Sequence, residues 1–278
     1  MKFHKLHGTG NDFVLIDARG QASRSWPEFA RAVCDRHFGV GADGILLVEV
    51  SALADYRMIM FNPDGSEAEM CGNGIRCFAK YLYDTGSIRG HAVSIETGGG
   101  IKDLEIEATG GVARRVTVDM GVPTFSPASI PILTDGAEVV DLARSIDGQA
   151  LLLTAVSMGN PHAVHFVEDD VLAFALERIG PLVEHDALFP KRVNFEIARA
   201  RSRGEVDVRV WERGAGITLA CGTGACAVFA AARRKGLVGD HAVIRLPGGE
   251  LELRVGPAGQ VLMAGPAESV FTGEWGDG

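Results

Sequence analysis

A short cysteine-glycine motif that occurs twice constrains this chain more than any other feature of its sequence. The two copies are Cys71-Gly72-Asn73-Gly74 and Cys221-Gly222-Thr223-Gly224, and each precedes an apolar segment with a second cysteine. Further matches recur around them in the same order and at nearly constant spacing, which is typical of a repeated architecture. They pair 10–14 with 159–164, 44–46 with 194–196, and Asn62 with Glu212. The repeat predicts two homologous domains rather than a single domain with two glycine-rich turns.

The composition is that of a globular protein and argues against a nucleic-acid partner. The chain has 278 residues, of which 46% are hydrophobic, and this is enough for two buried cores. The formal net charge is -9, and no run of lysine and arginine offers the basic face that phosphate groups require.

The sequence also predicts a cytoplasmic protein without a membrane span. The first eight residues lack the apolar core of a signal peptide. The longest uncharged run, 214–232, approaches the length of a membrane span, but it contains several glycines and ends in Arg233, Arg234, Lys235 and Gly236. Basic residues and a glycine at the end of such a run are typical of a buried helix.

The cysteines predict reduced thiols rather than a disulfide framework or a metal site. Five cysteines occur in a chain without a secretory signal. The spacings from Cys71 to Cys77 and from Cys221 to Cys226 do not match paired Cys-x-x-Cys zinc knuckles. We expect Cys34, Cys77 and Cys226 to pack in the cores as small apolar residues.

The order of apolar residues predicts many short strands and few helices, which is an α+β fold. Helices are expected from about Ser25 to His37, after each Cys-Gly-x-Gly motif to Gly86 and Lys235, and within 171–184. The segment 39–44 matches a dinucleotide fingerprint but follows a helix and precedes a strand, so it is expected to be a turn. Strands are expected near 12–17, 45–50, 57–61, 91–97, 101–108, 112–119, 151–156, 163–167, 192–198 and 206–211, with three more between 242 and 270.

The position of Cys71 and Cys221 just ahead of predicted helices gives both residues a chemical role. Unpaired N–H groups and the helix dipole favour negative charge there, so we expect a lowered thiol pKa and a usable base. Glycines let several N–H groups approach a bound carboxylate closely. If the two halves face each other, one thiolate removes an α-proton while the other thiol delivers a proton to the opposite face of the carbon. This reaction inverts a stereocentre without a cofactor.

Longer motifs make the chain similar to the diaminopimelate epimerase family over nearly its whole length. They are 7–13 (HGTGNDF), 61–66 (FNPDGS), 70–77 (MCGNGIRC), 159–162 (GNPH), 192–195 (RVNF), 212–216 (ERGAG) and 220–224 (ACGTG). The resemblance implies a cofactor-independent isomerase that interconverts LL- and meso-2,6-diaminopimelate, and it suggests a homodimer. It also implies two pseudo-symmetric, strand-rich barrel domains, each around a central helix, with bounds 1–118 plus 264–278 and 119–263.

The same resemblance implies roles for individual residues. Cys71 and Cys221 would be the acid/base pair, and the reacting carboxylate would lie on the N–H groups of Gly72, Asn73, Gly222 and Thr223. The far end of the substrate would be held by Asn62, Asn160, Asn194 and Arg213, and the reacting centre would be lined by Asn11 and Glu212. Fixed amides, one cation and one carboxylate suit a substrate with an ammonium and a carboxylate at each end.

Two departures and several alternatives accompany this interpretation. Gly44 stands where many family members carry Gln, and Ile217 replaces a common Glu. For His162, Asn11 and Asn160, the alternative interpretation is a structural role. For Glu212 and Arg213, it is an ion pair at the surface. The rival functions are an enzyme similar to proline racemase, which acts on a substrate with one carboxylate, and a thiol redox or binding protein with a reversible Cys71–Cys221 disulfide.

Overall fold

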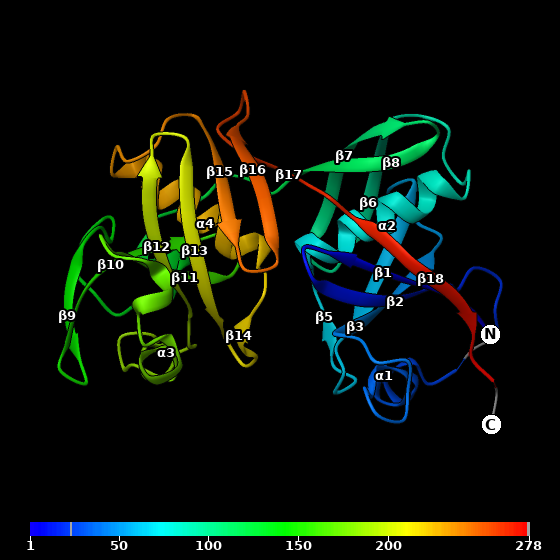
Figure 1. Ribbon diagram of the computed structural model, residues 1–278, viewed down its shortest axis with the longest axis horizontal. Helices are drawn as coiled ribbons and strands as arrows, with labels where there is room; N and C mark the ends of the chain where they lie inside the picture. Colours follow the sequence, from blue (N-terminus) through cyan, green and yellow to red (C-terminus); the bar gives the residue numbers. More distant parts are fainter. Residues whose placement is uncertain (23, 277–278) are drawn as a thin grey trace. The chain divides into compact units, whose positions relative to one another are not determined.

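The computed structural model describes residues 1–22 and 24–276, and contacts within the chain divide it into two compact units (Figure 1). Unit 1 comprises Met1–Asp119 and the C-terminal segment from Ala264, and unit 2 comprises Met120–Met263. Residues 277–278, which the predicted first domain includes, lie outside the described residues. No helix within 1–22 and 24–276 is long and apolar enough to cross a membrane.

Unit 1 is built on one run of hydrogen-bonded strands, with two helices beside it. The strand order is β18, β1, β2, β3, β4, β6, β7 and β8, and the short strand β5 extends β4 as a hairpin. The helices are α1 (Trp26–Cys34) and α2 (Gly72–Asp84). The strands are β1 (Lys2–Gly8), β2 (Asn11–Asp17), β3 (Gly44–Glu49), β4 (Tyr56–Phe61), β5 (Glu67–Ala68), β6 (Ala92–Thr97), β7 (Gly100–Thr109), β8 (Val112–Asp119) and β18 (Glu268–Glu274).

Unit 2 has the same kind of strand run, in the order β9, β10, β11, β12, β13, β15 and β16, with β14 paired to β13. Its helices are α3 (Leu176–Glu184) and α4 (Gly222–Arg234), with 3-10 turns at Pro127–Ser129 and Val171–Ala173. The strands are β9 (Leu142–Ile146), β10 (Gln149–Ser157), β11 (Pro161–Phe166), β12 (Asn194–Ser202), β13 (Glu205–Glu212), β14 (Gly216–Thr218), β15 (His241–Leu246) and β16 (Gly249–Val255). Strand β17 (Val261–Gly265) carries the chain from unit 2 back to unit 1.

The pattern of strand pairing repeats between the units. In unit 1, β2–β3 and β4–β6 are parallel, whereas β1–β2, β3–β4, β4–β5 and β6–β7 are antiparallel. In unit 2, β11–β12 and β13–β15 are parallel, whereas β10–β11, β12–β13, β13–β14 and β15–β16 are antiparallel. The predicted α+β fold with two pseudo-symmetric, strand-rich halves is confirmed.

The helix after each Cys-Gly-x-Gly motif lies in the core of its own unit. Helix α2 is buried along its length from Gly72 to Leu82 and packs on β1, β2, β3, β7, β8 and β18. Helix α4 contacts β10, β11, β12, β13, β15 and β16, and Figure 1 shows it among these strands. A helix buried on all sides belongs to a protein core, so each strand run is wrapped around a central helix. Helix α4 also accounts for the part of the uncharged run that follows Cys221, whereas 216–218 form β14.

The structure corrects the predicted elements in two respects, one helix end and several missed strands. Helix α1 ends at Cys34 rather than near His37, because Asp35 is extended and its carboxylate accepts the N–H groups of His37 and Phe38. A carboxylate that satisfies these N–H groups competes with the helical hydrogen-bond pattern. Strands β1, β5, β9, β14 and β18 were absent from the prediction. Strand β1 alternates polar and apolar residues only in part, and its centre is buried on both faces.

Candidate active site

Each motif cysteine caps the helix that follows it. Cys71 and Cys221 have extended backbones at the N-cap positions of α2 and α4. The Sγ of Cys71 accepts the N–H of Gly74 at 3.4 Å, and the Sγ of Cys221 accepts the N–H of Gly224 at 3.3 Å. The prediction that both cysteines stand at helix starts is confirmed, and each sulfur replaces the usual capping oxygen.

The residues after each cysteine occupy the first helical positions, where intrahelical bonds leave N–H groups unused. These residues are Gly72 and Asn73 in α2, and Gly222 and Thr223 in α4. The next residue is a glycine in both motifs, and a larger side chain there would crowd its neighbours. A Cβ at Gly74 would lie 3.2 Å from a methyl of Leu46, and one at Gly224 would lie 2.9 Å from Glu196 Oε1.

In unit 1, the structure brings together three of the predicted residues. The Cys71 thiol donates to Asn11 Oδ1 at 3.6 Å, and Asn73 Nδ2 donates to the same oxygen at 3.2 Å. The amide of Asn11 is held from its other end, because its Nδ2 donates to Asp43 Oδ2 at 2.8 Å. Asp43 therefore fixes which end of the Asn11 amide faces the sulfur.

A buried arginine organises the start of α2. Arg76 is 0% exposed, and its guanidinium donates to Gly72 O at 2.9 Å, Asn73 Oδ1 at 2.9 Å and Pro266 O at 3.2 Å. Because Oδ1 of Asn73 accepts from Arg76, the Nδ2 group of Asn73 is directed to Asn11. Arg76 thus fixes the amide of Asn73.

In unit 2, a longer chain of polar side chains leads to the second cysteine. Cys221 Sγ lies 3.4 Å from Thr223 Oγ1, which accepts a hydrogen bond from Asn160 Nδ2 at 3.3 Å. Asn160 Oδ1 lies 3.0 Å from His162 Nε2, and His162 Nδ1 lies 2.7 Å from Glu196 Oε1. Both His162 and Glu196 are completely buried. His162 therefore has the hydrogen-bonded structural setting that the sequence left as an alternative.

The expectation of a lowered thiol pKa is wrong for Cys221. Its burial, followed by the nearby negative charge of Glu212, raises the pKa of this thiol well above its usual value. Hydrogen bonds from Thr223 and the Gly224 N–H act in the opposite direction but do not outweigh burial. The helix start supplies favourable N–H groups, yet desolvation of the sulfur dominates.

Of the remaining predicted residues, Asn194 and Arg213 are joined by a hydrogen bond. Asn194 Nδ2 donates to Pro161 O at 2.9 Å, and its Oδ1 accepts the Arg213 N–H at 2.8 Å. The Arg213 side chain donates to Lys191 O at 3.2 Å. Thr218 donates to Glu212 Oε1 at 2.5 Å. Asn62 follows β4, where its Nδ2 donates to Ser66 Oγ at 3.0 Å within a turn.

The two departures from the family pattern lie in different settings. Gly44 begins β3, and a Cβ there would lie 2.8 Å from Phe61 O, so a larger residue requires a shift of the backbone. Ile217 is 40% exposed on β14. The side chain of Ile217 is therefore open to solvent, and only Gly44 is restricted by its neighbours.

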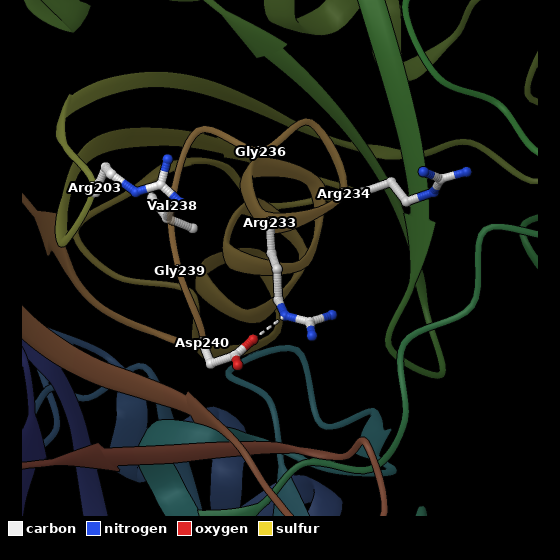
Figure 2. Close-up of a pocket in the computed structure, with 7 residues that line it drawn as sticks. All are labelled: Arg203, Arg233, Arg234, Gly236, Val238, Gly239 and Asp240. Atoms are coloured by element: carbon white, nitrogen blue, oxygen red, sulfur yellow. Dashed lines mark hydrogen bonds and ion pairs between the residues drawn. The ribbon is translucent and has the colours of Figure 1, made fainter.

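A pocket of about 520 Å³ lies elsewhere in unit 2, around the end of α4 (Figure 2). Arg233 donates to Asp240 at 2.7 Å, and Arg234 donates to Glu138 at 2.7 Å. Figure 2 shows the Arg234 side chain directed away from those of Arg203 and Arg233. The predicted site residues do not line this pocket, and two of its three guanidinium groups already pair with carboxylates.

Sequence reasoning missed Asp43, Arg76 and Glu196. Each left a signal. Arg76 stands in the apolar segment after the first motif, and Glu196 stands in the apolar run 193–198, so both are charges in segments predicted to be buried. A charged residue in a buried segment needs a polar partner, so it is a candidate for a structural or catalytic role.

Comparison with known proteins gives one consistent family. The family model described as "Diaminopimelate epimerase" matches residues 3–126 and 154–270. The diaminopimelate epimerase of Acetivibrio thermocellus is 47% identical over 99% of this chain and 98% of its own length, and that of Desulfitobacterium hafniense is 48% identical over 98% and 97%.

Solved structures share the fold at low sequence identity. A probable proline racemase from Agrobacterium radiobacter K84 has a TM-score of 0.73 at 16% identity, over 100% of this chain and 93% of that one. A PhzF-family phenazine biosynthesis protein from Bacillus anthracis has a TM-score of 0.71 at 18% identity, over 98% and 97%. These likenesses show the fold, whereas the full-length relatives and the family model show that this chain belongs to the diaminopimelate epimerase family.

Proposed function

We propose that this protein interconverts LL- and meso-2,6-diaminopimelate by proton transfer at an α-carbon. One observation carries the proposal: two related helices each begin with a capping cysteine followed by residues whose N–H groups can bind a carboxylate. Membership in the diaminopimelate epimerase family supports the choice of substrate. The product serves lysine and peptidoglycan precursor biosynthesis.

The proposed reaction balances with the two thiols alone. One thiolate takes the α-proton, and the electron pair of the broken C–H bond is delocalised into the substrate carboxylate. The other thiol forms the new C–H bond from the opposite face and leaves as a thiolate. At the end, one sulfur has gained a proton and the other has lost one, so no cofactor is consumed.

The helix starts suit the charge that develops in this reaction. A carboxylate gains negative charge as the α-proton leaves, and preorganised N–H groups stabilise such a charge. We assign this role to the N–H groups of Gly72, Asn73, Gly222 and Thr223. The positive ends of two helix dipoles act in the same sense.

The environment of Cys221 suggests which of the two cysteines is the acid and which is the base. Because burial and Glu212 raise the pKa of Cys221, this residue enters the reaction as a thiol and donates its proton. Cys71 is then the base in that direction. In the reverse direction the two residues exchange roles, as reversibility requires.

Six polar residues are assigned to substrate recognition. We place Asn62, Asn160, Asn194 and Arg213 at the far end of the substrate, and Asn11 and Glu212 near the reacting centre. An arginine binds a carboxylate through two parallel bonds, and fixed amides bind both ammonium and carboxylate groups. We further propose that the epimerase domains are 1–118 plus 264–278 and 119–263, and that the protein is a cytoplasmic homodimer, which sedimentation equilibrium tests.

The substrate is tested by following stereoisomers directly. Purified reduced protein is incubated with LL-diaminopimelate or with the meso isomer, and the mixture is resolved by chiral chromatography. The proposal predicts the same final mixture from either side. Conversion of L-proline instead of diaminopimelate would show that the enzyme acts on another substrate. Oxidation of the two thiols to a disulfide, without conversion of either compound, would favour a redox protein.

A further inference from the structure

A buried pair of one carboxyl group and one imidazole is linked to the Cys221 sulfur by hydrogen bonds through Asn160 and Thr223. Glu196 on β12 and His162 on β11 are both 0% exposed, and their side chains meet at 2.7 Å. The neighbouring strands β11 and β12 hold these two residues. His162 stands two positions after Asn160 and opposite Asn194. The reaction described above does not use this pair.

The number of protons on the pair follows from its surroundings. With one shared proton, the pair would carry a net negative charge. That charge would be poorly compensated, because Glu196 Oε2 has no hydrogen-bond partner among the described residues, 1–22 and 24–276. With two protons the pair is neutral, whether as carboxylate and imidazolium or as carboxylic acid and imidazole. Burial of an uncompensated charge is costly, so the neutral pair is favoured.

The proton count fixes the direction of the hydrogen bonds that follow. In both forms of the neutral pair, His162 Nε2 carries a hydrogen and donates to Asn160 Oδ1. The Asn160 amide therefore presents its Nδ2 group to Thr223 Oγ1. A hydroxyl that accepts from Asn160 keeps its own hydrogen for the Cys221 sulfur, 3.4 Å away. From His162 onward, every donor in the chain then points toward the sulfur.

We propose that Glu196 is a positioning residue: with His162, it fixes the direction of a hydrogen-bond chain through Asn160 and Thr223 that stabilises the Cys221 thiolate. The use of that thiolate in turnover rests on the proposed function, whereas its stabilisation does not. The chain acts against burial and the charge of Glu212, both of which raise the pKa of Cys221.

Removal of Glu196 changes the pKa of Cys221 in opposite directions under the proposed role and under a simple charge effect. Charged side chains that act on the Cys221 sulfur come from two strands, Glu212 on β13 and Glu196 on β12, beside the start of α4. If Glu196 acted only through its negative charge, its removal would favour the thiolate. If Glu196 acts through the chain, its removal disfavours the thiolate, because Asn160 is free to turn and Thr223 loses its fixed direction.

The test is a titration of the Cys221 thiolate by its ultraviolet absorbance, with the matching Cys221→Ala protein subtracted to remove the other cysteines. We expect Glu196→Leu to raise the midpoint by about one pH unit, and Thr223→Val to raise it similarly. In the double variant Glu196→Leu/Thr223→Val, the midpoint should match that of Thr223→Val alone. The valine already removes the last hydrogen bond to the sulfur, so the loss of Glu196 has no further effect through the chain. A lower midpoint in Glu196→Leu, or additive shifts, would overturn the proposal.

A neighbouring residue supplies the matched control. Ile197 follows Glu196 on β12, is equally buried, and packs in the apolar cluster of unit 2 with Leu153 and Phe195. Ile197→Ala should leave the Cys221 midpoint unchanged. An equal shift in this variant would show that loosening of β12 alone explains the result.

A second measurement needs no substitution at Glu196, so it stands even if the leucine variant fails to fold. Nitrogen NMR of the His162 ring in the unaltered protein should show Nε2 bearing a hydrogen across neutral pH. An unprotonated Nε2 would overturn the proposal. Neither readout involves substrate, so a protein with the expected titration but no diaminopimelate turnover would contradict only the proposed function.

Discussion

Asp43 accepts a 2.8 Å hydrogen bond from Asn11 and thereby turns the Asn11 amide oxygen toward the Cys71 thiol. In unit 2, the related residue Asn160 is turned the other way, with its oxygen toward His162 and its nitrogen toward Thr223. The two motif cysteines therefore have different polar neighbours, an acceptor at Cys71 and a hydroxyl at Cys221.

Replacement of Asp43 should reduce turnover without unfolding the protein. In Asp43→Ala, the Asn11 amide loses the bond that sets its direction, and we expect kcat to fall about tenfold. The matched control is Asp35→Ala, which removes an exposed carboxylate that binds only local N–H groups. Steady-state kinetics with both variants checks this, and an unaltered kcat in Asp43→Ala contradicts the assigned role.

Arg76 should contribute strongly to stability. Its guanidinium is fully buried and donates to backbone carbonyls and to Asn73, all of which lose a donor in Arg76→Met. We expect the free energy of unfolding to fall by about 3 kcal/mol. Urea unfolding of the two proteins measures the difference. A loss below about 1 kcal/mol would mean that water replaces these bonds at little cost.

Removal of the Glu212 charge should favour the Cys221 thiolate. After burial, Glu212 is the largest influence that raises the pKa of this thiol. In Glu212→Gln, we therefore expect the midpoint of the Cys221 thiolate titration to fall. Glu205→Gln, at the opposite end of β13, is the control and should leave the midpoint in place. A raised or unaltered midpoint in Glu212→Gln would contradict the electrostatic account.

Stability should decline in acid through Asp12. Burial opposes ionisation of this carboxyl, but hydrogen bonds from Arg36 and Lys5 outweigh it and lower the pKa to about 2. A folded-state pKa below the unfolded value adds stability at neutral pH, and this is lost as the pH falls from about 5 toward 2.

Asp12→Asn tests this linkage. The variant should be less stable than the unaltered protein by about 1 kcal/mol at pH 7, and the difference should shrink at lower pH. Urea unfolding across that pH range provides the measurement. A difference that is independent of pH would assign the effect to packing rather than to ionisation.

The fold was largely predictable because its signals are local and repeated. The Cys-Gly-x-Gly motifs predicted the starts of α2 and α4, and the strands near 12–17, 57–61 and 206–211 appear as β2, β4 and β13. Strand β1 escaped prediction because its burial depends on neighbours from distant parts of the chain, β2 and β18.

The surroundings of the cysteines were less predictable, because they depend on tertiary contacts. Cys221 has the same motif as Cys71, but its pKa is set by burial and by Glu212, which the motif does not encode. Likewise, no local pattern links Asp43 to Asn11, 32 residues earlier, or Glu196 to His162, 34 residues earlier. The substrate-binding roles of Asn62, Asn160, Asn194 and Arg213 stay predictions.

The most direct test of the two-thiol reaction is solvent proton exchange at the α-carbon. Reduced protein is incubated with LL-diaminopimelate in D2O, and NMR follows deuterium at the α-carbon while the stereoisomers are resolved. Cys71→Ala and Cys221→Ala are run beside it, with Cys34→Ala as a control for a buried thiol outside the motifs. We predict deuterated meso product with the unaltered protein and with Cys34→Ala, and loss of epimerisation in both motif variants. Epimerisation that survives removal of either motif cysteine would contradict the mechanism.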